Sequence, residues 1–197
     1  MTDSQKIIEL AKNNNGIVTA SMVTEAGISR GVLKYVSDNG NLEKVTRGVY
    51  TLPDIFDDEF VNIQNRYKRG VFSLETALFL VNLTDRTPAK FNMVFPATYN
   101  LTGPKSEGIL CRNSREPYYS LGLSKLKTPG GNIVIGYCPE RSLCDVLKSR
   151  NHTDIQIITE AFKKYVSLKE KNIPLLSDYA HKLYVEDRLR AYLEVLL

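Results

Sequence analysis

One short segment near the N-terminus places basic and aromatic side chains together on the outside of a helix. Within residues 29–39 the apolar positions recur at helical spacing and define an inner face. The outer face then carries Arg30, Lys34 and Tyr35. Arginine and lysine bind phosphates and base edges, so this face has the chemistry of a helix that enters the major groove of DNA.

Further polar side chains flank that helix in the sequence. The segment after it carries Lys44 and Arg47, which we expect to lie beside the groove-facing side. The helix before it begins at Thr19 or Ser21, whose hydroxyls are expected to contact a phosphate and fix the register. The predicted DNA-contacting residues are Thr19, Ser21, Ser29, Arg30, Lys34, Tyr35, Lys44 and Arg47.

Three helices and a hairpin are predicted to position these side chains. The helices run from Thr2 or Asp3 to residues 13–16, from Thr19 or Ser21 to Gly27, and over residues 29–39. Residues 42–46 and 49–53 alternate like two strands and are separated by Arg47 and Gly48. Three helices followed by a two-stranded ribbon indicate a winged helix-turn-helix.

The rest of the chain predicts a larger domain of mixed α+β class. We place the boundary near residues 54–57, which gives domains at 1–56 and 57–197. The predicted strands of the second domain, in a small mixed or antiparallel sheet, are residues 91–95, 108–112, 118–121 and 133–137. Its predicted helices are residues 60–67, 73–83, 139–148, 154–166, 177–184 and 186–196. The fold class is therefore α+β, with an N-terminal winged helix-turn-helix followed by a larger mixed α+β domain.

Composition excludes several protein classes and limits how strongly the first domain binds nucleic acid. The chain has 197 residues, of which 43% are hydrophobic and 24% charged, so disordered, collagen-like and coiled-coil proteins are excluded. Residues 1–53 carry six basic and five acidic side chains. A domain so weakly charged predicts modest DNA affinity unless two copies bind together. The alternative is that the winged helix docks onto a protein.

Enzyme motifs are largely missing. The sequence has no phosphate-binding P-loop, no GxGxxG after a strand, no GxSxG and no Asp-x-Lys or Glu-x-Lys pair of the metal-dependent nucleases. It has two histidines, and neither shows the spacing of a triad or a metal site. We therefore expect no catalytic residue, no metal site and no cofactor. A nucleic-acid-modifying enzyme guided by the winged helix remains the enzymatic alternative.

The cysteines and the N-terminus predict a cytoplasmic protein without disulfides. Cys111, Cys138 and Cys144 form no CxxC pair, and we expect Cys138 and Cys144 to be small buried side chains. Arg141 and Asp145 stand four residues apart on a predicted helix and are expected to form an ion pair. No basic-then-apolar signal peptide begins the chain, and no apolar run approaches the length that spans a bilayer.

Four blocks of the sequence resemble the AbiEi antitoxins of type IV, abortive-infection toxin–antitoxin systems. In chain order they are residues 42–53, 72–78, 83–88 and 139–145. The resemblance implies a bacterial phage-defence protein whose winged helix binds double-stranded DNA at inverted repeats in its own promoter and represses its operon. It also implies that the second domain counters a nucleotidyltransferase-like toxin without forming a stable complex, and that no membrane is involved.

Basic residues of the second domain are candidates for the antitoxic surface. They are Lys90, Arg112, Arg115, Lys125, Lys127, Lys148 and Arg150. The alternative is that these charges are scattered over a solvated perimeter, because charged side chains normally lie outside. A second function also stays open, namely a stand-alone winged-helix regulator whose larger domain senses a ligand or mediates oligomerisation. We further expect that the protein is a monomer that binds DNA cooperatively.

Overall fold

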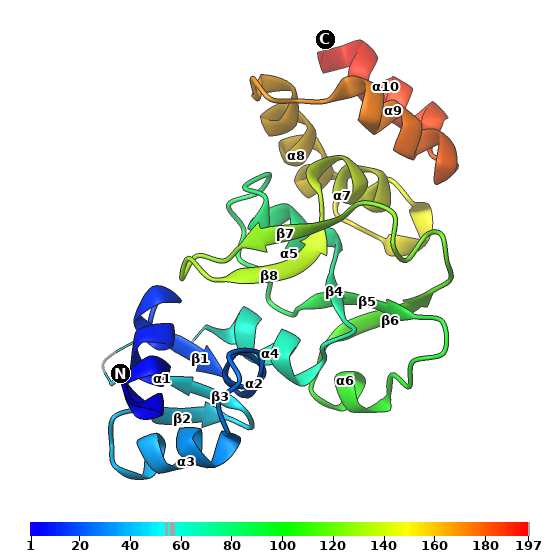
Figure 1. Cartoon of the computed structure of the whole chain (residues 1–197). Coiled ribbons are helices and arrows are strands. Elements are labelled where there is room, and N and C mark those ends of the chain that lie inside the picture. Colours follow the sequence, from blue (N-terminus) through cyan, green and yellow to red (C-terminus); the bar gives the residue numbers. More distant parts are fainter. Residues whose placement is uncertain (54, 56–57, 197) are drawn as a thin grey trace. The chain divides into compact units, whose positions relative to one another are not determined.

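The computed structural model describes residues 1–53, 55 and 58–196 and has the predicted α+β class (Figure 1). The chain forms two compact units. Unit 1 comprises Met1–Lys68 together with Lys127–Val134, and unit 2 comprises Arg69–Leu126 and Ile135–Leu197. The predicted boundary at residues 54–57 lies outside the described residues except for Ile55, and the division at 56/57 stays a prediction.

The three predicted helices of unit 1 are present, and side-chain caps begin each of them. They are α1 (Asp3–Asn13), α2 (Ala20–Glu25) and α3 (Arg30–Asp38). Thr2 and Gln5 form a capping box at the start of α1, Thr19 caps α2 and Ser29 caps α3. Because each cap satisfies backbone N–H groups locally, helix starts are encoded within a few residues.

The wing of unit 1 belongs to a three-stranded antiparallel sheet. Its strands are β1 (Ile17–Thr19), β2 (Glu43–Thr46) and β3 (Val49–Thr51), in the order β1-β3-β2. The alternation of the sequence predicted β2 and β3, and β1 is a third strand that pairs with β3. Val18 packs with buried side chains of α1 and α3, including Ile7 and Leu33, in one apolar core.

A distant loop completes unit 1 through a buried carboxylate. Asp58 precedes α4 (Glu59–Arg66) and accepts hydrogen bonds from the backbone N–H groups of Phe60 and Val61. Its other oxygen accepts from the Thr128 hydroxyl at 2.6 Å and from Asn132 Nδ2 at 2.8 Å. These long-range contacts place Lys127–Val134 in unit 1, which sequence periodicity did not predict.

Unit 2 contains a five-stranded mixed sheet. The loop that joins the last two strands of this sheet, with the adjoining strand ends (Lys127–Val134), belongs to unit 1. The strand order is β6-β5-β4-β8-β7. β4 pairs antiparallel with β5 and parallel with β8, and β5 pairs parallel with β6. The strands are β4 (Val71–Phe72), β5 (Asn92–Pro96), β6 (Leu110–Ser114), β7 (Leu123–Lys127) and β8 (Ile133–Tyr137).

The predicted strand at residues 118–121 is wrong, because these residues form a turn. Backbone N–H groups of Tyr119 and Leu121 donate to the carbonyls of Arg115 and Pro117, which a paired strand could not do. Gly122 then adopts φ +78°, and the strand β7 begins at the next residue. The aromatic and apolar residues of this turn imitate the composition of a strand.

Helices cover the rest of unit 2. They are α5 (Leu74–Leu80), α6 (Thr102–Ser106), α7 (Pro139–Val146), the 3-10 helix η1 (Ser149–Asn151), α8 (Ile155–Ser167), α9 (Ile173–Lys182) and α10 (Glu186–Leu196). Helix α6 was not predicted from the sequence, and the predicted start of α9 is four residues late, because Asn172 caps that helix. Leu143, Phe162 and Leu176 of three helices share one buried cluster.

At α7 the predicted ion pair is confirmed, and the predicted burial is correct for Cys144 but wrong for Cys138. Arg141 Nε and Asp145 Oδ2 form the predicted ion pair at 2.8 Å. All three cysteines are free thiols, Cys144 is fully buried, and Cys138 is half-buried rather than buried. Burial raises the pKa of Cys144 to about 12, so this thiol stays protonated at neutral pH.

Candidate nucleic-acid interface

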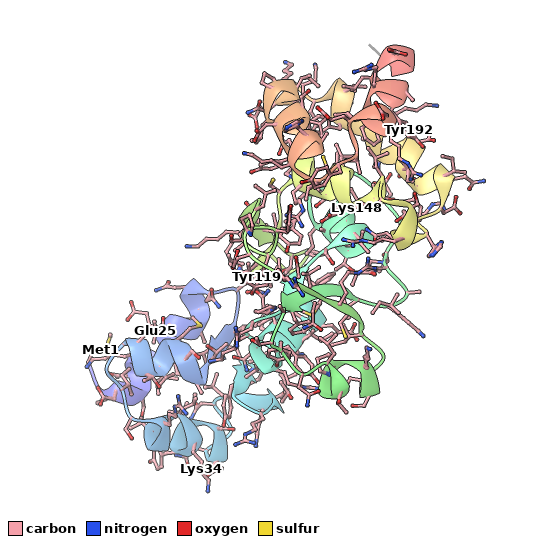
Figure 2. All side chains as sticks on the ribbon, turned by 90° about the vertical axis from the view of Figure 1, so that its right-hand side faces the viewer. Met1, Glu25, Lys34, Tyr119, Lys148 and Tyr192 are labelled. Carbon is pink, nitrogen blue, oxygen red and sulfur yellow. The ribbon has the colours of Figure 1, made fainter. Side chains whose placement is uncertain are left out.

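The outer face of α3 presents the predicted polar side chains to solvent. Leu33 and Val36 are buried in the core of unit 1, whereas Arg30, Lys34 and Tyr35 are exposed. The ring of Tyr35 is 63% exposed, and the Lys34 side chain projects away from the helix (Figure 2). An α-helix of this length has the dimensions to enter a major groove.

Arg30 joins the two helices of the helix-turn-helix. Its Nε donates a hydrogen bond at 3.1 Å to the hydroxyl of Thr24 on α2. Ser29 accepts a hydrogen bond from the N–H of Gly31 at 3.2 Å, so its hydroxyl acts as the cap of α3. The start of the outer helix is thus fixed by two polar side chains that also lie on its exposed side.

The wing turn lies beside the start of α2. Gly48, at φ +81°, forms the turn after Arg47, and its carbonyl accepts from the N–H of Ala20 at 2.9 Å. Lys44 is exposed on β2, opposite Tyr50, and a β-bulge separates that pair from the next one. Lys44 and Arg47 are therefore held on a short ribbon that is anchored to the helix-turn-helix.

The hydroxyls predicted to contact phosphate are engaged within unit 1. Thr19 Oγ1 caps α2 by accepting from the N–H of Met22 at 3.2 Å. The Ser21 hydroxyl accepts a hydrogen bond from Lys68 Nζ. Both residues lie at the start of α2 as predicted, and their contact with DNA stays a prediction.

Two basic residues beyond the predicted domain join this surface. Arg66, in the last turn of α4, donates from Nη2 to the Thr46 hydroxyl of the wing at 3.1 Å. Lys68 reaches Ser21, and Asn65 Nδ2 donates to the carbonyl of Arg47 at 3.3 Å. The predicted DNA-contacting residues did not include these two, because residues 57–197 were predicted to form the other domain. The basic last turn of α4, directly after the wing, was the available signal.

The cations of this surface can serve as a phosphate-binding frame. The exposed basic residues on the hairpin and after it are called the wing surface here. They are Lys44, Arg47, Arg66 and Lys68. Such cations contact the sugar-phosphate backbone without reading sequence, while the outer face of α3 carries the side chains that can reach base edges.

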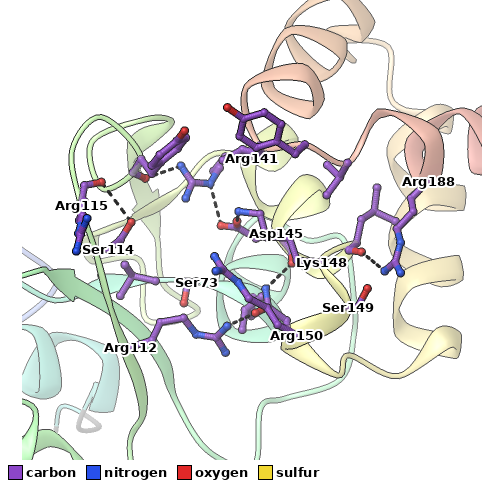
Figure 3. Close-up of a pocket in the computed structure, with 18 of the residues that line it drawn as sticks. Ser73, Arg112, Ser114, Arg115, Arg141, Asp145, Lys148, Ser149, Arg150 and Arg188 are labelled. Carbon is purple, nitrogen blue, oxygen red and sulfur yellow. Dashed lines mark hydrogen bonds and ion pairs between the residues drawn. The ribbon is translucent and has the colours of Figure 1, made fainter.

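The predicted antitoxic residues do not form one cluster. Four of them, Arg112, Arg115, Lys148 and Arg150, line a single cavity of about 1000 Å³ in unit 2 (Figure 3). Lys90 and Lys125 are exposed elsewhere in unit 2, and Lys127 belongs to unit 1. Arg141 and Arg188 also line the cavity, and neither was among the predicted antitoxic residues.

No metal-binding cluster of three or more His, Cys, Asp or Glu side chains occurs within residues 1–53, 55 and 58–196. In the same ranges, no helix is both long enough and apolar enough to cross a membrane.

Comparisons with known proteins agree with the winged-helix interpretation. Residues 5–53, about a quarter of the chain, match the family model described as "Transcriptional regulator, AbiEi antitoxin". The crystal structure of the RV2827C protein from Mycobacterium tuberculosis is similar in fold, with a TM-score of 0.52 and 12% identity over 95% of this chain and 77% of that chain. No curated protein matches the sequence significantly. Residues 5–53 of this chain are thus similar to the AbiEi antitoxin family of transcriptional regulators.

Proposed function

We propose that this protein is the autoregulatory antitoxin of a type IV toxin–antitoxin system that acts in phage defence. In this proposal it binds inverted repeats in its own promoter, represses its operon and counters a nucleotidyltransferase-like toxin. The observation that carries the proposal is the exposed Arg30, Lys34 and Tyr35 face of α3 within the domain that matches the AbiEi family.

In the proposed DNA complex, α3 and the wing surface have different roles. The outer face of α3 enters the major groove, and the wing surface contacts the phosphates on either side of it. Residues 1–53 carry six basic and five acidic side chains, so one copy gains little from charge alone. Two monomers that bind inverted repeats cooperatively compensate for that weak attraction.

The antitoxic role is assigned to unit 2 and needs neither catalysis nor a stable complex with the toxin. Its cavity gathers four of the basic residues that the sequence selected, and these are the best candidates for the antitoxic determinants. Lys90, Lys125 and Lys127 lie outside that cavity and are the weaker candidates. Both functions act in the cytoplasm.

Operator binding is tested by fluorescence anisotropy with the DNA upstream of the operon. Lys34→Ala should weaken binding by about tenfold, because a lost base contact costs about 1–3 kcal/mol. Lys44→Ala should weaken binding to all sequences and lower the slope of log K against log salt by about one. Lys6→Ala on α1 is the matched control, and an equal loss there would refute the assignment of the face.

Antitoxicity is tested by rescue of cells that express the toxin. Arg30→Ala and Lys34→Ala should leave rescue intact, whereas Arg112→Ala, Arg115→Ala and Lys148→Ala should reduce it while operator binding persists. If the α3 variants also fail to rescue, the proposed division of labour is wrong.

A second candidate function is favoured by the cavity itself. A volume of about 1000 Å³ lies at the upper end of the range for small-molecule sites, as expected of a regulator that senses a ligand. A ligand-dependent change in operator affinity, together with failure to rescue cells from the toxin, would favour this regulator over the antitoxin.

A further inference from the structure

The cavity of unit 2 is lined by more cationic than acidic side chains. It lies where the end of β6, the helix α7, the helix η1 and the start of α10 contribute side chains (Figure 3). Six cationic and four acidic residues line it. We call this cavity the basic pocket. Its ten charged lining residues are Arg112, Arg115, Glu116, Arg141, Asp145, Lys148, Arg150, Glu186, Asp187 and Arg188.

Some of these charged side chains are already bonded to other groups of the protein. Asp145 accepts from Arg141 Nε at 2.8 Å and from Lys148 Nζ at 2.7 Å. Arg188 donates to the carbonyl of Leu147 at 2.6 Å, and Glu116 accepts from the Ser120 hydroxyl at 2.6 Å. Asp145 and Glu116 are thus engaged by donors of the protein, so they oppose an entering anion less than free carboxylates would.

Three other arginines of the pocket are available to bind an anion. The side chains of Arg115 and Arg150 are exposed and have no hydrogen-bond or ion-pair partner within the part of the chain that the structure describes. Arg112 is half-buried and bonds to Asn151. Burial lowers the pKa of Arg112, the nearby carboxylate of Asp145 opposes that shift, and the charge of Arg150 adds to it. Arg112 and Arg150 line the same cavity and repel each other, so an anion bound between them would relieve that repulsion.

A buried hydroxyl at the same pocket lacks a partner. Ser73 is 1% exposed and lines the cavity, and its Oγ has no hydrogen-bond partner among residues 1–53, 55 and 58–196. Buried polar atoms without a partner are rare, because each carries the full cost of its desolvation. This hydroxyl is a donor that a bound oxyanion could satisfy.

Two aromatic rings also line the pocket. Tyr118 and Tyr184 are exposed, the latter by 85%, and the neighbouring Tyr184 raises the pKa of Tyr118. Exposed aromatic faces next to cations are the elements with which proteins hold a nucleobase and its phosphates.

We propose that the basic pocket binds a nucleotide, with its phosphates held by Arg112, Arg115 and Arg150 and its base stacked on Tyr184. The Ser73 hydroxyl donates to a phosphate oxygen. Nucleotide binding goes beyond the proposed antitoxin function and needs neither the toxin nor the operator. The ligand is a free nucleoside triphosphate or the 5′-triphosphate end of an RNA strand, which present the same chemistry.

Isothermal titration calorimetry on the full-length protein tests this proposal. The probes are the four ribonucleoside triphosphates, inorganic triphosphate, a nucleoside without phosphate, and a short RNA with or without a 5′-triphosphate. We expect a nucleoside triphosphate or the triphosphorylated RNA to bind more tightly than either inorganic triphosphate or the nucleoside, and the RNA arm identifies the source. Equal binding of inorganic triphosphate, or no binding by any phosphorylated probe, would overturn the proposal.

Variants locate the site. Arg115→Ala and Arg150→Ala change exposed side chains and should each weaken binding about tenfold, the loss expected for one charge-assisted hydrogen bond. Tyr184→Ala should weaken nucleotide binding but leave the affinity for inorganic triphosphate unchanged. Lys90→Ala, an exposed cation of unit 2 outside the pocket, is the matched control. Unchanged affinity in both arginine variants, with folding verified by circular dichroism, would place the ligand elsewhere and refute the site.

Discussion

Replacing Asp145 with Asn tests whether one buried carboxylate holds the cationic wall of unit 2 together. The Asp145 side chain is almost fully buried and bonds to both Arg141 and Lys148, and the Arg141 side chain is buried as well. An asparagine keeps the size of the side chain but removes the negative charge. Arg141 would then be a buried cation without a counter-charge.

The magnitude follows from what Arg141 retains. Breaking a buried ion pair typically costs about 3–5 kcal/mol. Arg141 Nη1 still donates to the carbonyls of Tyr118 and Leu121, and its guanidinium lies 4.3 Å from the centre of the Tyr137 ring. These contacts favour the lower end of the range. A loss of about 3 kcal/mol corresponds to a decrease of about 6–12 °C in the Tm of a chain of this size.

Thermal unfolding followed by circular dichroism measures this decrease. The matched control is Asp178→Asn, because Asp178 pairs with Lys182 at the same i,i+4 spacing and at 2.7 Å, but both side chains are exposed. That exposed pair should contribute less than about 1 kcal/mol. If Asp145→Asn lowers the Tm no more than Asp178→Asn does, the buried pair does not stabilise unit 2 as argued.

Three further predictions concern local features of the fold. Gly122→Ala should destabilise the protein by more than about 1 kcal/mol, because φ is +78° and the new Cβ would lie 2.6 Å from Arg141 Cβ; a Tm equal to wild type would contradict this. Thr128→Val removes the hydroxyl that Asp58 accepts at 2.6 Å and should cost about 1–3 kcal/mol in urea unfolding, whereas an unchanged midpoint would show that the loop is not anchored there. The raised pKa of Cys144 means that its thiol ionises near pH 9 when unfolded but near pH 12 when folded, so stability falls as pH rises through this window. The free energy of unfolding of Cys144→Ala should fall less steeply with pH over the same range. Equal pH dependence in the variant and the wild type would exclude the thiol as the cause.

The sequence by itself determined the local parts of the winged helix. The helix starts at Thr2, Thr19 and Ser29 depend on side chains that cap backbone groups two or three residues away. The outer face of α3 follows from helical periodicity, which is also a local property. For the same reason the Arg141–Asp145 pair could be predicted from two positions on one helix.

Only the tertiary structure decided which distant residues meet. Asp58 bonds to Thr128 and Asn132 from a loop about seventy residues away, and this contact assigns that loop to unit 1. Arg112 and Arg150 come from β6 and η1 and reach one cavity, while Lys90 and Lys125, equally basic in sequence, do not. Periodicity reports which face of an element is apolar, but the pairing of strands and the packing of helices determine which faces enclose a common space. The exposed face of α3 and the two basic residues of the hairpin could therefore be predicted from the sequence, whereas Arg66 and Lys68 beside the hairpin and the basic pocket are brought together only in the folded chain.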